Sequence, residues 1–96
     1  MARVELSVAA VEDLQELIIS HSLPGDTPAR VARSLRALER FPEMGVALGG
    51  RWSGTRFLLG PWRWMLVVYV VLDEGARVVV VTIQDARAAS TPTAER

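Results

Sequence analysis

Arginine is the residue type in this sequence with the clearest capacity for chemistry, because it supplies all 11 of the permanently cationic side chains. A guanidinium group is planar and binds phosphate or carboxylate through two parallel hydrogen bonds. The absence of Lys can also reflect a GC-rich genome, which is the simpler explanation. Composition alone therefore does not predict an anion site. Such a site can be predicted only from the positions of the arginines in the sequence.

Three of these arginines occupy positions suited to binding an anion. Arg87 follows Asp85 by two residues at the end of a Val-rich segment, so both side chains lie on one side if the strand persists. Either Asp85 holds a guanidinium that contacts phosphate or a partner, or the two form a surface ion pair of small effect. Arg56 and Arg63 flank Gly60-Pro61 and could converge on one patch across a hairpin, unless both are ordinary solvated strand residues.

Two other side chains are suited to proton transfer. His21 is the single imidazole of the chain, and imidazole is the side-chain group best suited to proton exchange near neutral pH. It is in phase with Leu14 and Ile18 on a predicted helix, which favours a structural or helix-end role. Tyr69 lies mid-strand among valines, and it can act as an acid or base only if that face of the sheet is open. Otherwise Tyr69 is packed.

The three tryptophans, Trp52, Trp62 and Trp64, could stack on nucleic-acid bases. Large aromatic side chains in a small sheet more often anchor the core or a protein interface, and we favour that interpretation. No metal or cofactor site is predicted, because the chain has one His and no Cys. Gly49-Gly50 lacks the following helix and Lys of a phosphate-binding loop. No Ser-His-Asp arrangement is predicted either.

Charge is unevenly distributed although the net charge is zero. Residues 1–26 have a balance of −4, residues 27–63 a balance of +5, and residues 64–96 a balance of −1. Arg33, Arg36 and Arg40 fall within roughly 60° of one another on a helical wheel. They form either a stripe that faces nucleic acid or a solvated helix face, and the solvated face is the default.

The elements that position these residues can be predicted from periodicity and turn signals. We expect strands at Arg3–Ser7, Trp52–Leu59, Trp62–Leu72 and Arg77–Asp85, and helices at Val8–His21 and Pro28–Arg40, the second with Thr27 as its N-cap. The strand at 62–72 is apolar on both faces, so it is covered on both faces or has one face waiting for a partner. Residues 1–89 should form one domain, and residues 90–96 a disordered tail.

The cellular location can be predicted from the absence of export and membrane-spanning signals in the sequence. The first residues contain no signal-peptide pattern, and the longest apolar run, residues 64–72, is too short to span a membrane as a helix. The chain has no Cys, which is compatible with a reducing compartment. We therefore expect a cytoplasmic protein with no membrane partner.

Several short motifs occur in series along the chain. They are Leu23-Pro24, Leu38-Glu-Arg-Phe-Pro42, Gly54-Thr-Arg56, Trp62-Arg63, Val68-Tyr69 and Asp85-Ala-Arg87. In this order and spacing, over roughly residues 3–89, the sequence resembles the RelE/ParE superfamily of bacterial type II toxin–antitoxin toxins. The resemblance implies an α+β fold of order β-α-α-β-β-β, with an N-terminal helical hairpin packed on a small, mainly antiparallel sheet.

The resemblance also implies a function. Toxins of this superfamily are cytoplasmic, are neutralised by a cognate antitoxin, and act either on mRNA at the ribosome as metal-independent endoribonucleases or on DNA gyrase. Arg56, Arg63 and Arg87 fall at positions similar to the family's basic positions, with Tyr69 as a further catalytic candidate. The alternative is a non-catalytic or degenerate member that retains antitoxin binding or self-association, and a homodimer is possible in either case. Neither branch implies a cofactor or a metal.

Overall fold

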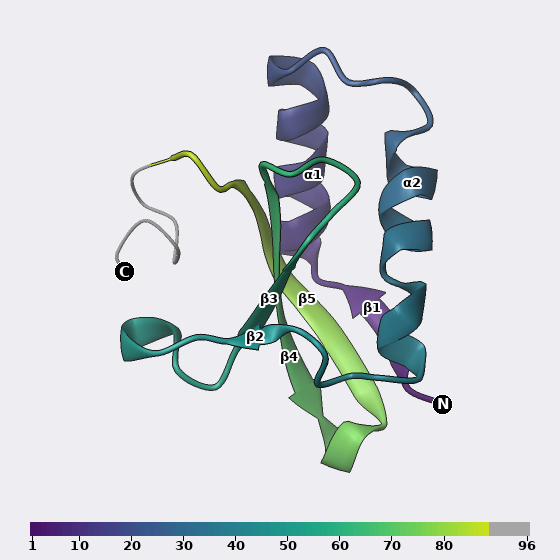
Figure 1. Ribbon diagram of the computed structural model, residues 1–96. Coiled ribbons are helices and arrows are strands. Elements are labelled where there is room, and N and C mark those ends of the chain that lie inside the picture. Colours follow the sequence, from purple (N-terminus) through teal and green to yellow (C-terminus); the bar gives the residue numbers. More distant parts are fainter. Residues whose placement is uncertain (89–96) are drawn as a thin grey trace.

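The computed structural model describes residues 1–88, in which two helices pack on one five-stranded sheet (Figure 1). The helices are α1 (Val8–Ser20) and α2 (Thr27–Ser34), and single 3-10 turns cover Arg36–Glu39, Gly50–Trp52 and Asp73–Gly75. The strands are β1 (Arg3–Leu6), β2 (Val46–Ala47), β3 (Arg56–Leu59), β4 (Met65–Leu72) and β5 (Arg77–Asp85). The predicted α+β class is confirmed, while the predicted disordered tail, residues 90–96, lies outside the described residues.

The strand order across the sheet is β1-β5-β4-β3-β2, and only the ladder between β1 and β5 is parallel. The first and last strands of the chain are therefore neighbours. Ser7 joins β1 to α1, and its side chain accepts a hydrogen bond from the backbone N–H of Ala10 (3.1 Å), as an N-cap does. Because α1 packs against β5, its C-terminal end comes to lie beside the C-terminal end of β5 (Figure 1).

The β1–β5 ladder ends at Val80. Beyond this residue, a carboxylate of α1 accepts hydrogen bonds from β5 in place of the neighbouring strand. Asp13 of α1 accepts hydrogen bonds from the backbone N–H of Ile83 (3.2 Å) and from the hydroxyl of Thr82 (2.6 Å). A strand N–H without a partner would otherwise be left beside the helix, at a cost comparable to a lost hydrogen bond. Asp13 therefore helps to fix how α1 is placed along β5.

The second helix is shorter than predicted. It ends at Ser34 instead of Arg40, and the 3-10 turn at Arg36–Glu39 follows it. In a 3-10 turn, residues three apart lie on one side, so the change of helix type leaves both Leu35 and Leu38 buried. The N-cap is Asp26 and not Thr27, which is the first helical residue and donates its hydroxyl hydrogen to the carbonyl of Pro24 (2.6 Å).

Two of the predicted strands begin later than the sequence suggests. Trp52 lies in a 3-10 turn, and Gly54 has φ of +89°, a conformation that favours glycine and interrupts an extended chain. The strand predicted at Trp52–Leu59 therefore starts at Arg56. The strand predicted at Trp62–Leu72 starts at Met65, because the N–H of Met65 bonds to the carbonyl of Trp62 (3.0 Å) in a turn.

The order β-α-α-β-β-β omitted one short strand, β2, which pairs with β3 at the edge of the sheet. Two residues are too few to give a periodic signal. The strand at Arg77–Asp85 was predicted correctly, and the predicted N-terminal strand and first helix each extend one residue beyond the observed element.

The two faces of the sheet have different environments. Met65, Val67 and Tyr69 face the helices and belong to the buried core. On the other face, Val46 pairs with Phe57 and Leu59 pairs with Leu66 across neighbouring strands. Val46 is 52% exposed and Leu59 46% exposed. The helices cover one apolar face, while the opposite face retains exposed apolar side chains near its β2–β3 edge.

A β-bulge changes the side-chain alternation along β5. Tyr69 pairs with Val80, whereas Val68 pairs with Thr82, which leaves Val81 as the extra residue. After the bulge the odd-numbered residues of β5 face the helices. Ile83 is consequently in the core, and Asp85 is directed to the side on which α1 ends.

Neither α1 nor α2 has the length or the apolar character that a membrane-spanning helix needs, and this holds for all helices within residues 1–88.

Candidate functional site

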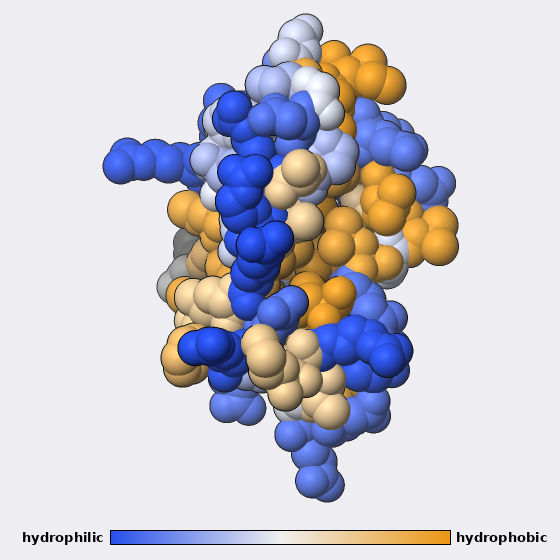
Figure 2. All heavy atoms as spheres, turned by 90° about the vertical axis from the view of Figure 1, so that its right-hand side faces the viewer, coloured by the Kyte–Doolittle hydropathy of each residue, from blue (hydrophilic) through white to orange (hydrophobic). Residues whose placement is uncertain are grey.

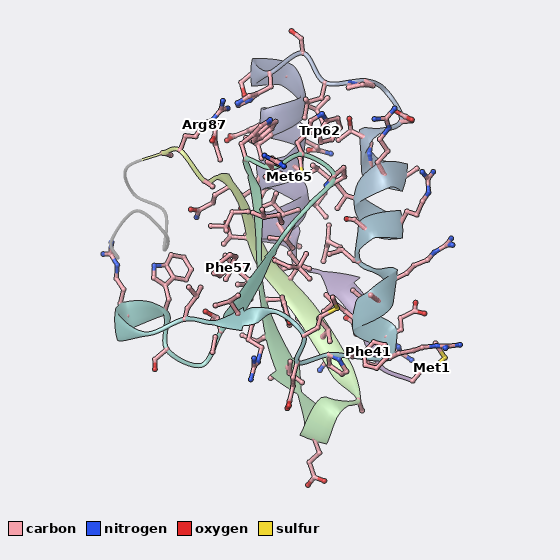
Figure 3. All side chains as sticks on the ribbon, in the orientation of Figure 1. Met1, Phe41, Phe57, Trp62, Met65 and Arg87 are labelled. Carbon is pink, nitrogen blue, oxygen red and sulfur yellow. The ribbon has the colours of Figure 1, made fainter. Side chains whose placement is uncertain are left out.

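Five side chains meet where α1 and β5 end, and we call them the end cluster: His21, Trp62, Trp64, Asp85 and Arg87. Arg87 Nη2 donates to Asp85 Oδ2 (2.7 Å) and Arg87 Nε donates to Asp85 Oδ1 (2.9 Å), a bidentate pair. The Nε2 atom of His21 lies 3.0 Å from Asp85 Oδ2 and 3.4 Å from Arg87 Nη2. Figure 3 shows Arg87 and Trp62 at this end of the molecule.

The ionised form of Asp85 is strongly favoured. The Arg87 guanidinium holds the pKa of this carboxyl far below its usual range, and hydrogen bonds from the Arg87 backbone and from His21 act in the same direction. The same pairing raises the pKa of Arg87. The Arg87 side chain is nevertheless 65% exposed, whereas Asp85 is 20% exposed. An incoming anion therefore meets a guanidinium whose counterion is already in place.

Aromatic rings form the wall of the end cluster. The rings of His21 and Trp64 stack with centroids 4.4 Å apart, and Trp62 stacks on Trp64 at 6.3 Å. The guanidinium carbon of Arg87 lies 5.3 Å from the Trp64 ring centroid, and that of Arg30 lies 5.7 Å from the Trp62 ring centroid. Cation–π contacts of this kind orient a guanidinium on a rigid surface. Trp62 and Trp64 pack against the core, as the sequence favoured.

A chain of hydrogen-bonding groups links a serine to this carboxylate, which the sequence did not predict. Ser20 Oγ lies 2.9 Å from His21 Nδ1, and His21 Nε2 contacts Asp85. Nucleophilic catalysis also requires donors aimed at the developing oxyanion. Ser20 is the last residue of α1, and a helix C-terminus presents carbonyl oxygens and a negative dipole end. The arrangement is therefore better suited to holding His21 in place than to activating Ser20.

A hollow beside the end cluster separates α1 from the free edge of β5. Its volume is about 520 Å³. It is lined by Asp13, Glu16, Leu17, Ile19, Ser20, Ile83, Gln84, Asp85 and Ala88. Its acidic side chains make it unsuitable for phosphate, so phosphate would approach the end cluster from the side of Arg87.

Tyr69 and Arg56 form a second group, with Gly45, which we call the Tyr69 cluster. Tyr69 is fully buried, and its hydroxyl oxygen accepts a hydrogen bond from the backbone N–H of Gly45 (2.9 Å). Arg56 Nη1 donates to the carbonyls of Glu43 (3.1 Å) and Gly45 (2.9 Å). Burial raises the pKa of Tyr69. Its face of the sheet is closed, so the condition for an acid–base role of Tyr69 is not met.

The three predicted site arginines do not gather in one place. Arg56 pairs with Tyr69 in the middle of β4, whereas Arg87 follows Asp85, which pairs with Met65 at the start of β4. Four residues of strand separate these points by about 13 Å. Arg63 is exposed and lies in the turn before β4, not on the strand predicted at Trp62–Leu72. Because Arg56 pairs with Tyr69 further along β4, the two arginines do not form one patch across the hairpin.

Candidate metal ligands are not grouped in the described part of the chain, since no three His, Cys, Asp or Glu side chains in residues 1–88 are arranged to hold an ion.

Solved structures from several toxin–antitoxin systems share the fold of this chain. No protein-family model matches this sequence, and no curated protein is significantly similar to it. A chain of the RelBE2 toxin–antitoxin complex from Mycobacterium tuberculosis matches with a TM-score of 0.65 and 24% identity, over 88% of this chain and 96% of that chain. A chain of the P. aeruginosa ParDE system matches with a TM-score of 0.68 and 15% identity, over 91% and 98%.

A chain of the E. coli RelBE toxin–antitoxin complex matches with a TM-score of 0.66 and 14% identity, over 92% of this chain and all (100%) of that chain. At these identities the likeness concerns the fold. The RelE/ParE resemblance inferred from the sequence motifs is therefore confirmed as a RelE/ParE-like fold.

Proposed function

We propose that this protein is the toxin of a bacterial type II toxin–antitoxin pair. The observation that carries the proposal is the agreement of its fold, over about nine-tenths of the chain, with chains of RelBE and ParDE toxin–antitoxin systems. The end cluster adds a solvent-exposed guanidinium and an imidazole at one end of the sheet. Arg87 and His21 are its functional side chains in this proposal.

A cognate antitoxin would bind the sheet face opposite the helices. Val46 and Leu59 are exposed there, beside half-buried Phe57. Exposed apolar side chains on a sheet face are energetically suited to burial by a partner segment. The short edge strand β2 also leaves one row of backbone groups available for an added strand. Self-association through the same face would compete with the antitoxin.

If the target is mRNA at the ribosome, the chemistry is phosphodiester cleavage by the neighbouring 2′-hydroxyl. In that reaction Arg87 would hold the scissile phosphate and offset its developing charge, while His21 exchanges a proton with an attacking or leaving oxygen. Asp85 opposes this step, because its carboxylate occupies two of the guanidinium nitrogens. Phosphate binding would have to displace it. Inhibition of DNA gyrase would require binding alone.

The second candidate function is a non-catalytic member of the fold that retains antitoxin binding or self-association. Two observations favour it: the bidentate Asp85–Arg87 pair and the burial of Tyr69. Both reduce the number of side chains available for cleavage.

Induced expression in a bacterial host tests these candidates. Growth arrest that is relieved by co-expression of the small protein encoded next to this gene supports the toxin function. Primer extension on cellular mRNA then separates cleavage from a gyrase supercoiling defect. Normal growth at verified soluble expression, with tight binding to that neighbour, supports the second candidate. Normal growth without binding contradicts both.

A further inference from the structure

The outward surface of α2 and the following 3-10 turn is made of three residue types. Its exposed residues are Pro28, Ala29, Arg30, Ala32, Arg33, Arg36, Ala37 and Arg40. Glu39, the acidic residue within this segment, is half-buried. Seen from the α2 side, a column of strongly hydrophilic side chains runs down this face, with hydrophobic surface beside it (Figure 2). The exposed surface of this segment is therefore basic, with small side chains between the arginines.

We call Arg33, Arg36 and Arg40 the arginine ridge. The residues that anchor the same segment to the sheet are Val31, Leu35 and Leu38, all of them buried. The exposed arginines and the buried anchors alternate along the chain through the change from α-helix to 3-10 turn. All three ridge arginines are therefore exposed to solvent on a segment that is fixed to the core.

The ridge arginines have no counterion in the described structure. Arg30, at the upper end of the segment, donates from Nε to Asp26 Oδ2 (3.0 Å) and is also near the Trp62 ring. No carboxylate within residues 1–88 forms an ion pair with Arg33, Arg36 or Arg40, in contrast to Arg77 and Arg87. Three adjacent unpaired guanidinium groups repel one another and attract a polyanion.

We propose that the arginine ridge binds the phosphate backbone of a nucleic acid. A guanidinium fork matches phosphate geometry. Arg40 follows Arg33 by seven positions, a span of roughly 10–14 Å, which is long enough to contact successive phosphates of one strand. A protein partner would need apolar or aromatic anchors, but the side chains between the arginines are alanines. The ridge is distinct from the end cluster, and its binding does not depend on the proposed toxin function.

Fluorescence anisotropy with a labelled, unstructured oligouridylate tests this site on the full chain. The ridge variant carries Arg33→Gln and Arg36→Gln. The control carries Arg3→Gln and Arg51→Gln, which lowers the charge equally at exposed positions outside the ridge. We expect the ridge variant to bind about tenfold more weakly at low salt and to lower the slope of log Kd against log salt by about 1.4, since each lost phosphate contact on a single strand is worth about 0.7. The control should change the affinity less than about twofold.

Three results would overturn the proposal. One is an equal loss of affinity in the ridge variant and the control, which would mean that net charge alone governs binding. The second is an absence of oligouridylate binding by the wild-type protein at low salt. The third is equal competition by polyglutamate, which would indicate an acidic protein partner. An Arg33→Lys, Arg36→Lys variant should keep most of the affinity, because Lys still binds phosphate as a point charge. Thermal unfolding of each variant verifies that the fold is retained.

Growth assays separate this proposal from the toxin function. Loss of oligouridylate binding with intact growth arrest would place nucleic-acid contact outside the toxic action. Retained binding in a chain that does not arrest growth would leave the ridge in place and contradict the toxin assignment.

Discussion

From the sequence, Arg56 and Arg87 are equivalent candidates for an anion site, but in the structure they have different hydrogen-bond partners. Arg56 donates to the backbone carbonyls of Glu43 and Gly45, next to the buried hydroxyl of Tyr69. Arg87 donates to one side-chain carboxylate, that of Asp85, at the molecular surface. A backbone carbonyl cannot leave its arginine without moving the chain, whereas a carboxylate can be displaced by another anion.

The partner that an arginine already has therefore decides whether the residue contributes to stability or is available to another anion. The Tyr69 cluster ties the link between α2 and β2 to the middle of the sheet, so its substitutions should change stability. In the end cluster, the Arg87 side chain is 65% exposed, so its substitution should change function with little change in stability.

The largest effect is expected for Gly45→Ala. A Cβ atom at this position would lie 2.5 Å from Tyr69 Oη and 2.7 Å from the carbonyl oxygen of Phe57. Because one of these neighbours is backbone, the overlap should lower the free energy of unfolding by about 3 kcal/mol. Gly49→Ala is the matched control, since a Cβ there has no neighbour within 4 Å. Urea unfolding of both variants measures the difference, and equal midpoints would contradict the close packing at Gly45.

Tyr69→Phe should have a smaller effect. It removes the acceptor for the buried N–H of Gly45 while preserving the ring, so the free energy of unfolding should fall by about 1–2 kcal/mol. The wild-type chain allows a second measurement, because Tyr69 is its single tyrosine. Burial raises the pKa of Tyr69, so phenolate absorbance should develop at higher pH in the folded protein than in urea, where the midpoint is about 10.

The sign of the linked stability follows from this shift. The stabilising contribution of the neutral Tyr69 is complete below the pKa of the unfolded state and is lost as the pH rises through the higher folded pKa. Identical titration of folded and unfolded protein would contradict the burial of this hydroxyl.

Arg56→Met and Arg87→Met should then separate the two sites directly. Arg56→Met removes two charge-assisted hydrogen bonds to carbonyls and should cost roughly 1 kcal/mol. Arg87→Met removes a surface pair and should change stability by less than about 0.5 kcal/mol. Urea unfolding at one pH compares them. A larger loss for Arg87 than for Arg56 would reverse the assignment of structural and functional arginine.

The smallest expected effect is the pH dependence of Asp85. Its folded pKa is depressed by Arg87, so its ionised form stabilises the native state above the unfolded pKa of about 4, and this contribution is lost as the pH falls through the folded pKa. The advantage of the wild-type protein over Asp85→Asn should be complete above about pH 5 and shrink in acid. Thermal unfolding measured across this pH range tests the prediction, and a constant difference would refute it.

Much of the fold was predictable because its signals are local. The strand at Arg77–Asp85, the Ser7 cap and the helical hairpin each follow from short-range patterns, and they are observed. The later starts of β3 and β4 were not predictable, because aromatic residues favour strands while positive φ at Gly54 and the turn at Trp62 break the extended chain. Tertiary packing sets these boundaries.

The candidate site was predicted only in part for a similar reason. The pairing of Arg87 with Asp85 follows from their two-residue spacing, and it is observed. The presence of His21 beside them requires the placement of α1 along β5, which depends on Asp13 and the β1–β5 ladder. These are long-range contacts. The signal available in the sequence was the position of His21 on the sheet-facing side of its helix, and it did not identify a partner.

The role of the end cluster is tested most directly by comparing growth inhibition by Arg87→Gln and Arg3→Gln, each induced to the same soluble level as the wild-type protein. We expect Arg87→Gln to lose growth arrest while its thermal stability stays close to that of the wild type. Arg3→Gln, with the same change in charge, should remain fully inhibitory. Full growth arrest by a folded Arg87→Gln protein would contradict the assignment of the end cluster as the site of action.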